Sequence, residues 1–358
     1  MAQLDIFQLM DLAIERGASD IHLSVGRKPA FRVHGRLVEI GDGPPLVPAD
    51  TEKLVRQFIG DTHLEELLRD GTTDFGYAHK DLARFRVSAL RQKGSLGLVM
   101  RLIPNELMTI EQIGLPDSII DLLDRPRGLI LVTGPTGSGK TTTLATMLDR
   151  INEERDVHIV TIEDPIEFYH PHKKAQVTQR EVGDDVPSFG EAMRRVLRQD
   201  PDVILLGEMR DLETTSAAIT AAETGHLVFG TLHTTGAART VDRIIDQYPT
   251  NQQEQIRAQL AVSLVAVISQ VLLPRADAPG RVAAFEVMII NSAIENQIRK
   301  GETFKITSAI QTSKRQGMIL LDDYLRDLVS QGKISPKTAI DAAQEPREME
   351  ERLLGGTV

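Results

Sequence analysis

Short apolar runs alternate with helical patterns between about residues 117 and 250. Four of these runs are strand candidates, because each is a continuous block of mostly branched or large apolar residues: Leu129–Thr133, Val157–Ile162, Val203–Leu206 and Leu227–Thr231. Strands that are separated by helices favour a parallel sheet covered by those helices. The pattern therefore predicts an α/β domain in the middle of the chain.

The pattern after about residue 250 is mostly helical. Its most apolar stretch, Leu260–Leu273, contains Ser263, Ser269 and Gln270. This stretch is too short and too polar to span a bilayer, which needs about 20 consecutive apolar residues. We therefore expect a buried core helix there, and a small helical tail over Met318–Leu354.

The first hundred residues have the pattern of a small α+β domain. Helices are predicted over Gln3–Arg16 and Thr51–Leu68, and strands over Ile21–Val25, Ala30–Val33, Arg36–Ile40, Phe75–His79, Ala83–Leu90 and Leu96–Leu102, with a hairpin turn at His34-Gly35. Pro104–Pro116 has no sustained period, so it is the expected linker. The predicted organisation is an N-terminal domain over 1–104, a linker over 105–116, an α/β domain over 117–290 and a helical region over 291–358.

Composition narrows the class of protein. The chain has 358 residues, no Cys, no Trp and a net charge of −10. Without Cys there are no disulfides and no thiolate zinc site, which suits a reducing cytoplasm. The negative charge argues against a general nucleic-acid coat, which needs a basic surface. Because no basic-then-apolar leader is visible, we expect a cytoplasmic protein, and any membrane role must come through a partner.

Residues 134–141 have the sequence Gly-Pro-Thr-Gly-Ser-Gly-Lys-Thr, which matches the phosphate-binding P-loop pattern G-x-x-x-x-G-K-[ST]. Glycines let the backbone turn its N–H groups toward phosphate oxygens, the lysine brings a charge to the β- and γ-phosphates, and the threonine hydroxyl can bind Mg²⁺. A buried strand precedes the loop and a helix follows it. The predicted nucleotide-binding residues are Gly134, Pro135, Thr136, Gly137, Ser138, Gly139, Lys140, Thr141 and Thr142.

Two further strands end in acidic residues, as a nucleotide hydrolase requires. Val203–Leu206 is followed by Gly207 and Glu208, which makes Glu208 a candidate Mg²⁺ carboxylate, although a solvated glutamate after a strand is the plainer account. Val157–Ile162 is followed by Glu163, a candidate to polarise the attacking water. A simple capped turn at Asp164-Pro165 explains this second segment about as well. We expect the edge of the second strand to lie beside the P-loop.

Histidines and arginines complete the candidate chemistry. His233 follows the strand that ends at Thr231, where it could contact the γ-phosphate or serve as a hydrogen-bonded structural residue. Arg84 and Arg86 fall on one face of a strand, and with Arg91 and Arg101 they form either a solvated basic face or a source of cations for a neighbouring subunit's nucleotide. His170 and His172 have no other residue at metal-ligand spacing, so they are expected to be loop residues.

Together these motifs resemble the retraction ATPases of type IV pili, the PilT family of the secretion-ATPase superfamily. The resemblance covers nearly the whole chain. It rests on residues 17–26, 31–37, 84–90 and 99–104, on the P-loop, on 161–168 (Thr-Ile-Glu-Asp-Pro-Ile-Glu-Phe), which looks like the aspartate box of the family, on 198–211, which looks like its Walker B segment, and on 230–235 (Gly-Thr-Leu-His-Thr-Thr), which looks like its histidine box.

The resemblance implies a Mg²⁺-dependent ATPase that assembles as a homohexamer. Each subunit would pair a PAS-like N-terminal domain with a RecA-like ATPase domain and hold ATP between them. It implies Glu163 as the catalytic glutamate, Glu208 as the Walker B acid near Mg²⁺, and Arg86 and Arg101 as nucleotide-contacting arginines. The implied function is pilus retraction. The expected partners are an inner-membrane pilus platform protein and a paralogous retraction ATPase, without nucleic acid.

One segment departs from the family pattern. The retraction-linked helix of the family reads Ala-Ile-Arg-Asn-Leu-Ile-Arg, whereas residues 293–299 read Ala-Ile-Glu-Asn-Gln-Ile-Arg. Glu295 reverses a charge and Gln297 replaces an apolar residue. The departure concerns coupling to the pilus machinery and not the ATPase core, and it fits a paralogue with altered or accessory output.

Three alternatives stay open. A pilus extension or type II secretion ATPase would have the same fold, but those enzymes commonly carry a longer N-terminal region and a four-cysteine metal module. A nucleic-acid translocase would need a stacking and phosphate-tracking groove, for which four Tyr, no Trp and a charge of −10 offer little material. A nucleotide-binding scaffold would keep the P-loop without turning ATP over.

Overall fold

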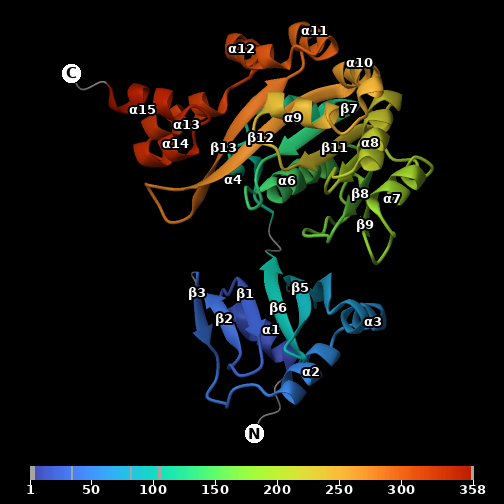
Figure 1. The fold of residues 1–358 in the computed structure, drawn as a ribbon, viewed down its shortest axis with the longest axis vertical. Helices are drawn as coiled ribbons and strands as arrows, with labels where there is room; N and C mark the ends of the chain where they lie inside the picture. Colours follow the sequence, from blue (N-terminus) through green and yellow to red (C-terminus); the bar gives the residue numbers. More distant parts are fainter. Residues whose placement is uncertain (1–4, 34, 81–82, 104–106, 356–358) are drawn as a thin grey trace. The chain divides into compact units, whose positions relative to one another are not determined.

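The structure is a computed structural model that describes residues 5–33, 35–80, 83–103 and 107–355. It divides into two compact units (Figure 1). The N-terminal unit runs to Leu107 and also takes in Pro165–Tyr169, and the larger unit comprises Met108–Asp164 and the chain from His170 onward. Each unit has a β-sheet of its own and is described by itself.

The N-terminal unit is built on a six-stranded antiparallel sheet in the order β3-β2-β1-β6-β5-β4. Its strands are β1 (Asp20–Leu23), β2 (Ala30–Val33), β3 (Arg36–Glu39), β4 (Thr72–His79), β5 (Ala83–Gln92) and β6 (Ser95–Ile103), and its helices are α1 (Ile6–Glu15), α2 (Pro48–Arg56) and α3 (Asp61–Asp70). Phe85, Val87 and Ala89 alternate along β5 with more exposed residues and are completely buried. This period of two is why a sheet with one buried face forms here.

Most elements predicted in this unit are confirmed, with one correction. The helix predicted over Thr51–Leu68 is wrong as a single helix, because α2 and α3 are separate. Gly60 between them has an extended backbone (φ −73°, ψ 161°) and is the N-cap of α3. Apolar periodicity alone does not reveal such a break, since both helices bury residues against the same core. The hairpin residue His34 and the start of the linker at Pro104 lie outside the described residues.

The larger unit contains a seven-stranded sheet in the order β13-β12-β7-β11-β10-β8-β9. Its strands are β7 (Gly128–Thr133), β8 (His158–Glu163), β9 (Gln176–Glu181), β10 (Val203–Leu206), β11 (Leu227–Leu232), β12 (Leu264–Pro274) and β13 (Arg281–Ile289). All neighbouring pairs are parallel except β12 with β13. Every residue of β7, β10 and β11 is buried, as expected for central strands covered on both faces. The α/β fold class and all four strands predicted from the sequence are therefore confirmed.

The buried core helix predicted over Leu260–Leu273 is wrong. Helix α10 (Gln253–Ser263) ends near the beginning of this stretch, and β12 occupies the rest of it. β12 pairs in parallel with β7 on one side and antiparallel with β13 on the other. A short apolar run does not separate a buried strand from a buried helix, so the pairing of distant segments decided the outcome.

The remaining helices cover this sheet or follow it. They are α4 (Ile110–Ile113) and α5 (Asp117–Ile120) before β7, then α6 (Lys140–Glu154), α7 (Phe189–Val196), α8 (Leu212–Thr224) and α9 (Ala237–Ile245), and after β13 α11 (Ser292–Lys300), α12 (Ile306–Thr312), α13 (Leu321–Ser330), α14 (Pro336–Ala342) and α15 (Pro346–Leu354). The short helix α4 lies within the stretch expected to be a linker. The predicted helical tail is confirmed, and the red end of the ribbon in Figure 1 shows it.

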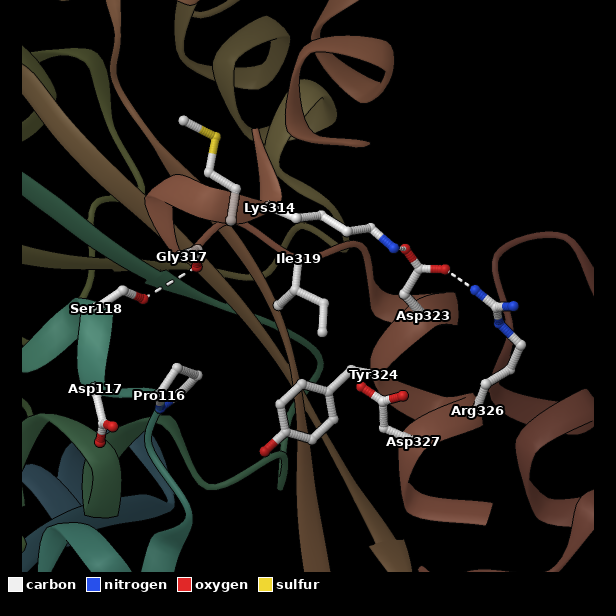
Figure 2. A pocket seen from close by; sticks show the side chains of 11 residues that line it. Pro116, Asp117, Ser118, Lys314, Gly317, Ile319, Asp323, Tyr324, Arg326 and Asp327 are labelled. Carbon is white, nitrogen blue, oxygen red and sulfur yellow. Dashed lines mark hydrogen bonds and ion pairs between the residues drawn. The ribbon is translucent and has the colours of Figure 1, made fainter. Parts of the chain in front are cut away.

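The C-terminal helices are attached to the start of α5 around a hollow of about 380 Å³ (Figure 2). The Ser118 hydroxyl donates to the Gly317 carbonyl at 3.0 Å, and the Tyr324 hydroxyl donates to the Gly114 carbonyl at 3.2 Å. On the other side of the hollow Asp323 binds Lys314 at 2.6 Å and also pairs with Arg326. The hollow contains none of the predicted nucleotide-binding residues, so it lies apart from the candidate site.

Candidate functional site

The P-loop lies between β7 and α6, the position that its motif requires. Gly134, Gly137 and Gly139 have φ of 143°, 78° and 89°, values that residues with a side chain rarely adopt. Gly139 is the N-cap of α6, so the loop leads directly into the first turn of a 15-residue helix. The N–H groups of a helix's first turn, together with the helix dipole, make this a natural place for phosphate.

Lys140 is folded back onto the loop that it follows. Its ammonium group donates to the Gly134 carbonyl at 2.9 Å and to the Pro135 carbonyl at 3.2 Å. These contacts keep the one positive charge of residues 134–141 at the loop. A phosphate that entered the loop would compete with these carbonyl oxygens for the ammonium group of Lys140, which already lies at the loop.

Glu208 and His233 meet in front of neighbouring strands. Glu208 follows β10 and His233 follows β11, and the two strands are paired in parallel. His233 Nε2 lies 3.2 Å from Glu208 Oε1, and His233 Nδ1 lies 3.5 Å from the Thr136 hydroxyl of the P-loop. Since β11 also pairs with β7, the histidine bridges the P-loop and the acid. The structure thus brings three of the predicted site segments together.

Glu208 is held in its charged form by Arg210. The Arg210 guanidinium lies 2.6 Å from Glu208 Oε1. Burial, the largest single influence, raises the pKa of the Glu208 carboxyl, but the hydrogen bond and charge of Arg210, with the contributions of His233, lower that pKa below the usual glutamate value overall. A carboxylate that is ionised at neutral pH is the kind of hard oxygen ligand that Mg²⁺ takes.

Glu163 ends β8 and is 7% exposed. Its carboxylate accepts a hydrogen bond of 2.6 Å from the Thr161 hydroxyl and one of 3.2 Å from the Gln179 amide on β9. Gly207 explains how close the two acidic strand ends lie, because a Cβ on Gly207 would be only 3.3 Å from Glu163 Cα. Glycine, where other families place an acid, therefore lets β10 approach the end of β8.

The sequence predicts that the end of β8 lies beside the P-loop, and in the sheet β8 is not a direct neighbour of β7, the P-loop strand. β11 and β10 are inserted between β7 and β8, so β8 is three strand spacings away, about 14 Å at the level of the backbone. Helical connections allow the strands of a parallel sheet to lie in an order that differs from their order along the chain. The order along the chain therefore does not determine which strands are neighbours. Glu163 is next to Glu208 but not next to the P-loop strand.

Arg86 and Arg101 belong to the N-terminal unit, where they are direct partners across β5 and β6. Their side chains are 46% and 69% exposed, and Arg101 pairs with Asp20 at 2.9 Å, while Arg86 lies 3.7 Å from Glu167. Arg84 shares their strand face but is 4% exposed and stacks on the Tyr169 ring at 4.3 Å. Contact of Arg86 and Arg101 with a nucleotide stays a prediction.

The histidines after β8 act as structural residues. The His172 ring accepts a hydrogen bond of 3.0 Å from the Val177 N–H. His170 is buried, and its Nδ1 lies 3.9 Å from Asp149 Oδ1. In the described part of the chain, no three His, Cys, Asp or Glu side chains lie where they could hold a metal ion together.

Sequence reasoning missed the polar residues of β12 and β13 that support the site. Ser269 accepts the Gly236 N–H at 2.9 Å, and Glu286 accepts the Ala237 N–H at 2.7 Å, so both hold the chain just after His233. Glu286 also accepts from the Gln344 amide at 2.8 Å, and burial raises the pKa of the Glu286 carboxyl. The neighbouring Gln270 contacts the P-loop. The signal is present in the sequence, because Ser269 and Gln270 interrupt one apolar run and Glu286 interrupts the next.

None of the helices in the described ranges has both the length and the apolar content that a membrane crossing requires.

Comparison with known proteins gives one consistent result. The family described as type II/IV secretion system protein matches residues 3–339. The type IV pilus retraction ATPase PilT of Pseudomonas aeruginosa is 48% identical over 96% of this chain and 99% of its own length. A twitching motility protein of Neisseria gonorrhoeae is 46% identical over 90% of this chain and 86% of its own.

A solved structure agrees with these relatives. The crystal structure of the pilus retraction motor PilT with bound ADP superposes with a TM-score of 0.91 at 46% identity, and covers 97% of this chain and 99% of that one. Both the sequence and the fold are therefore shared along nearly the whole length. The chain belongs to the type II/IV secretion system protein family, within which it resembles the pilus retraction ATPase PilT.

Proposed function

We propose that this protein is an ATP-hydrolysing motor that powers type IV pilus retraction. The observation that carries the proposal is the end-to-end likeness to PilT, at 48% identity over 96% of the chain, together with a P-loop whose neighbours carry Glu208 and His233. A likeness confined to the P-loop domain would support only nucleotide binding. The likeness here extends through the N-terminal unit and most of the C-terminal helices as well.

In the proposed mechanism the P-loop binds the phosphates of ATP. Backbone N–H groups of residues 134–139 and of the first turn of α6 surround them, and Lys140 exchanges its two carbonyl contacts for phosphate oxygens. The Thr141 hydroxyl and the Glu208 carboxylate would hold Mg²⁺, which is usually bound through one or two protein oxygens plus phosphates. The lowered pKa of Glu208 supports this assignment. Mg²⁺ would neutralise charge on the transferred phosphoryl group.

Glu163 is the proposed general base for the attacking water. It is buried, and Thr161 and Gln179 donate hydrogen bonds to its carboxylate, which orient that group. His233 is proposed to contact the γ-phosphate and to respond to its loss, because it lies between the Thr136 hydroxyl and Glu208. Arg86 and Arg101 are proposed to supply positive charge to the nucleotide from the N-terminal unit. Domain closure would then convert binding and hydrolysis into movement.

The proposed assembly is a homohexamer that acts through partners. The PilT resemblance supports the ring, and an inner-membrane pilus platform protein would transmit its motion, with a paralogous retraction ATPase as a further partner. The protein would work on the cytoplasmic side of the inner membrane, and nucleic acid has no part in the proposal.

Helix α11 favours a second candidate, an accessory retraction ATPase. Glu295, where the family pattern has arginine, forms an ion pair with Arg299 one turn later and so offsets its charge. The Gln297 amide oxygen, where the family pattern has leucine, is buried without a hydrogen-bond partner among the described residues. This helix would therefore present a different surface to the pilus machinery while the ATP site stays intact.

Deletion of the gene, with counting of surface pili, tests the proposal. A retraction motor predicts excess pili and lost twitching, an accessory ATPase predicts a partial defect, and an extension motor predicts bald cells. Complementation with Glu163→Gln should leave the deletion phenotype in place, whereas the wild-type gene should correct it. Purified protein that fails to hydrolyse ATP with Mg²⁺ supplied would contradict the motor and favour a binding scaffold.

A further inference from the structure

Gln270 is a polar side chain in the interior of the larger unit. It lies in the middle of β12 and is 2% exposed. The preceding residue, Ser269, is the register partner of Thr133, the last residue of β7. Gln270 therefore lies beside the point where β7 ends and the P-loop begins.

Both ends of the Gln270 amide are used in buried hydrogen bonds. Nε2 donates to the Ser138 carbonyl of the P-loop at 2.6 Å, and Oε1 accepts from the Thr143 hydroxyl of α6 at 2.8 Å. The orientation of the amide is determined by its partners, because a carbonyl can only accept and must face the NH₂ group. Gln270 thus connects the loop to the helix that follows it.

The contact with Ser138 has a consequence for the next N–H group. In a planar trans peptide the C=O and the following N–H point in opposite directions. Because the Ser138 carbonyl is directed at Gln270, the Gly139 N–H is turned to the side of the loop away from β12. A P-loop works by turning such N–H groups toward phosphate.

The same residue also limits the space around two P-loop glycines. A Cβ on Gly134 would lie 2.2 Å from the main-chain carbonyl oxygen of Gln270, and one on Gly139 would lie 2.9 Å from the side-chain Nε2 of Gln270. A Cβ on Gly137 would meet nothing within 4 Å. Gly134 and Gly139 are therefore packed against β12, whereas Gly137 is needed only for its backbone conformation.

We propose that Gln270 is a positioning residue of the nucleotide site, which holds the P-loop in its phosphate-binding shape through Ser138 and Thr143. The inference rests on the proposed ATP-binding function and adds a residue from a distant strand to it. Gln270 does not touch the nucleotide in this account. It acts by fixing the peptide between Ser138 and Gly139 and the start of α6.

The test compares nucleotide affinity with thermal stability in matched variants of the full chain. Gln270→Met keeps the length of the side chain and removes both hydrogen bonds. The Kd for ADP should therefore rise about 10- to 30-fold, which is the loss expected for two hydrogen bonds. Thr143→Val removes only the bond that orients the amide, and its Kd should rise roughly 3- to 10-fold. In the double variant the two effects should not add, because both act through one contact.

Thr146→Val is the matched control. Thr146 lies one turn further along α6 and is also buried, but its hydroxyl donates to the Met108 and Thr142 carbonyls, away from Gln270. This variant should lower the Tm while leaving the Kd for ADP unchanged. A similar loss of affinity in Thr143→Val and Thr146→Val would overturn the proposal, since any damage to α6 would then suffice.

The outcomes separate this inference from the proposed function. If the wild-type protein binds neither ADP nor ATP, the proposed function fails. If the wild type binds ADP and Gln270→Met binds it equally well, with only a lower Tm, Gln270 is a core residue and the inference alone fails. If Gln270→Met does not fold, the pair Thr143→Val and Thr146→Val decides, because each loses a single hydroxyl.

Discussion

The phosphate-binding side of the candidate site and its acidic side hold their functional groups by different means. The P-loop presents backbone groups, and its shape comes from three glycines and from contact with β12. The acidic side presents side chains, and each is oriented by another side chain: Glu163 by Thr161 and Gln179, and Glu208 by Arg210 and His233.

This difference separates two tasks. A backbone cradle has little freedom to change, so it suits binding, in which the same phosphates must be recognised in every cycle. Carboxylates and a histidine can change protonation, rotamer and partner, so they suit the steps in which charge moves. We therefore expect changes on the P-loop side to act on affinity and changes on the acidic side to act on turnover.

The largest expected effect is that of Glu163→Gln. The amide keeps the size of the side chain but is no base, so kcat for ATP hydrolysis should fall about 10²- to 10⁴-fold. The Kd for ADP should stay within about twofold, since Glu163 is three strands away from β7. Phosphate release and ADP titration measure the two quantities. Hydrolysis at the wild-type rate would remove Glu163 from the catalytic role.

Lys140→Ala should give the opposite result. The Kd for ATP should rise roughly 10- to 100-fold, because a charge-assisted contact with phosphate is worth about 1.5–3 kcal/mol. The free energy of unfolding should change little, because the ammonium group donates to carbonyls of its own loop. Lys173→Ala, a lysine that pairs with Asp149 and Glu153, is the control. Equal loss of affinity in both variants would mean that net charge and not position matters.

Gly134→Ala and Gly137→Ala test the P-loop side itself. Both glycines have positive φ, but only a Cβ at 134 would collide with β12, at 2.2 Å from the Gln270 carbonyl oxygen. We expect Gly137→Ala to cost about 1 kcal/mol of unfolding free energy and Gly134→Ala about 2–3 kcal/mol. Urea unfolding measures both. Equal costs would show that backbone conformation alone, without the contact to β12, determines the loop.

The smallest expected effect concerns acid pH and the acidic side. Because the folded-state pKa of Glu208 is lowered, its ionised form adds stability above the usual glutamate pKa of 4.5, and this stability is lost as the pH falls through the folded value. Arg210→Met should reduce that loss by less than about 1 kcal/mol, since the Arg210 side chain is 73% exposed and screened. Unfolding free energies at pH 7 and pH 4 give the difference. An unchanged pH dependence would mean that Arg210 does not set the charge of Glu208.

The two sides of the site were also predictable to different degrees. The P-loop could be identified from eight consecutive residues, because all the groups it needs are local and glycine spacing encodes them. Glu208 and His233 could be placed at strand ends, and parallel pairing then brought them together. The separation of β8 from the P-loop strand could not be predicted, because strand order is a property of the whole sheet.

The sequence by itself determined the local features: where β7, β8, β10 and β11 form, the P-loop, and the candidates Glu163, Glu208 and His233. These follow from apolar runs and motifs, which depend on neighbouring residues. Only the tertiary structure decided that residues 264–274 form a strand and that Gln270 reaches the P-loop. Residues 134 and 270 are far apart in the chain, and no local pattern records which backbone pairs with β7. That choice depends on how the two apolar surfaces and the buried hydrogen bonds fit together in the folded unit.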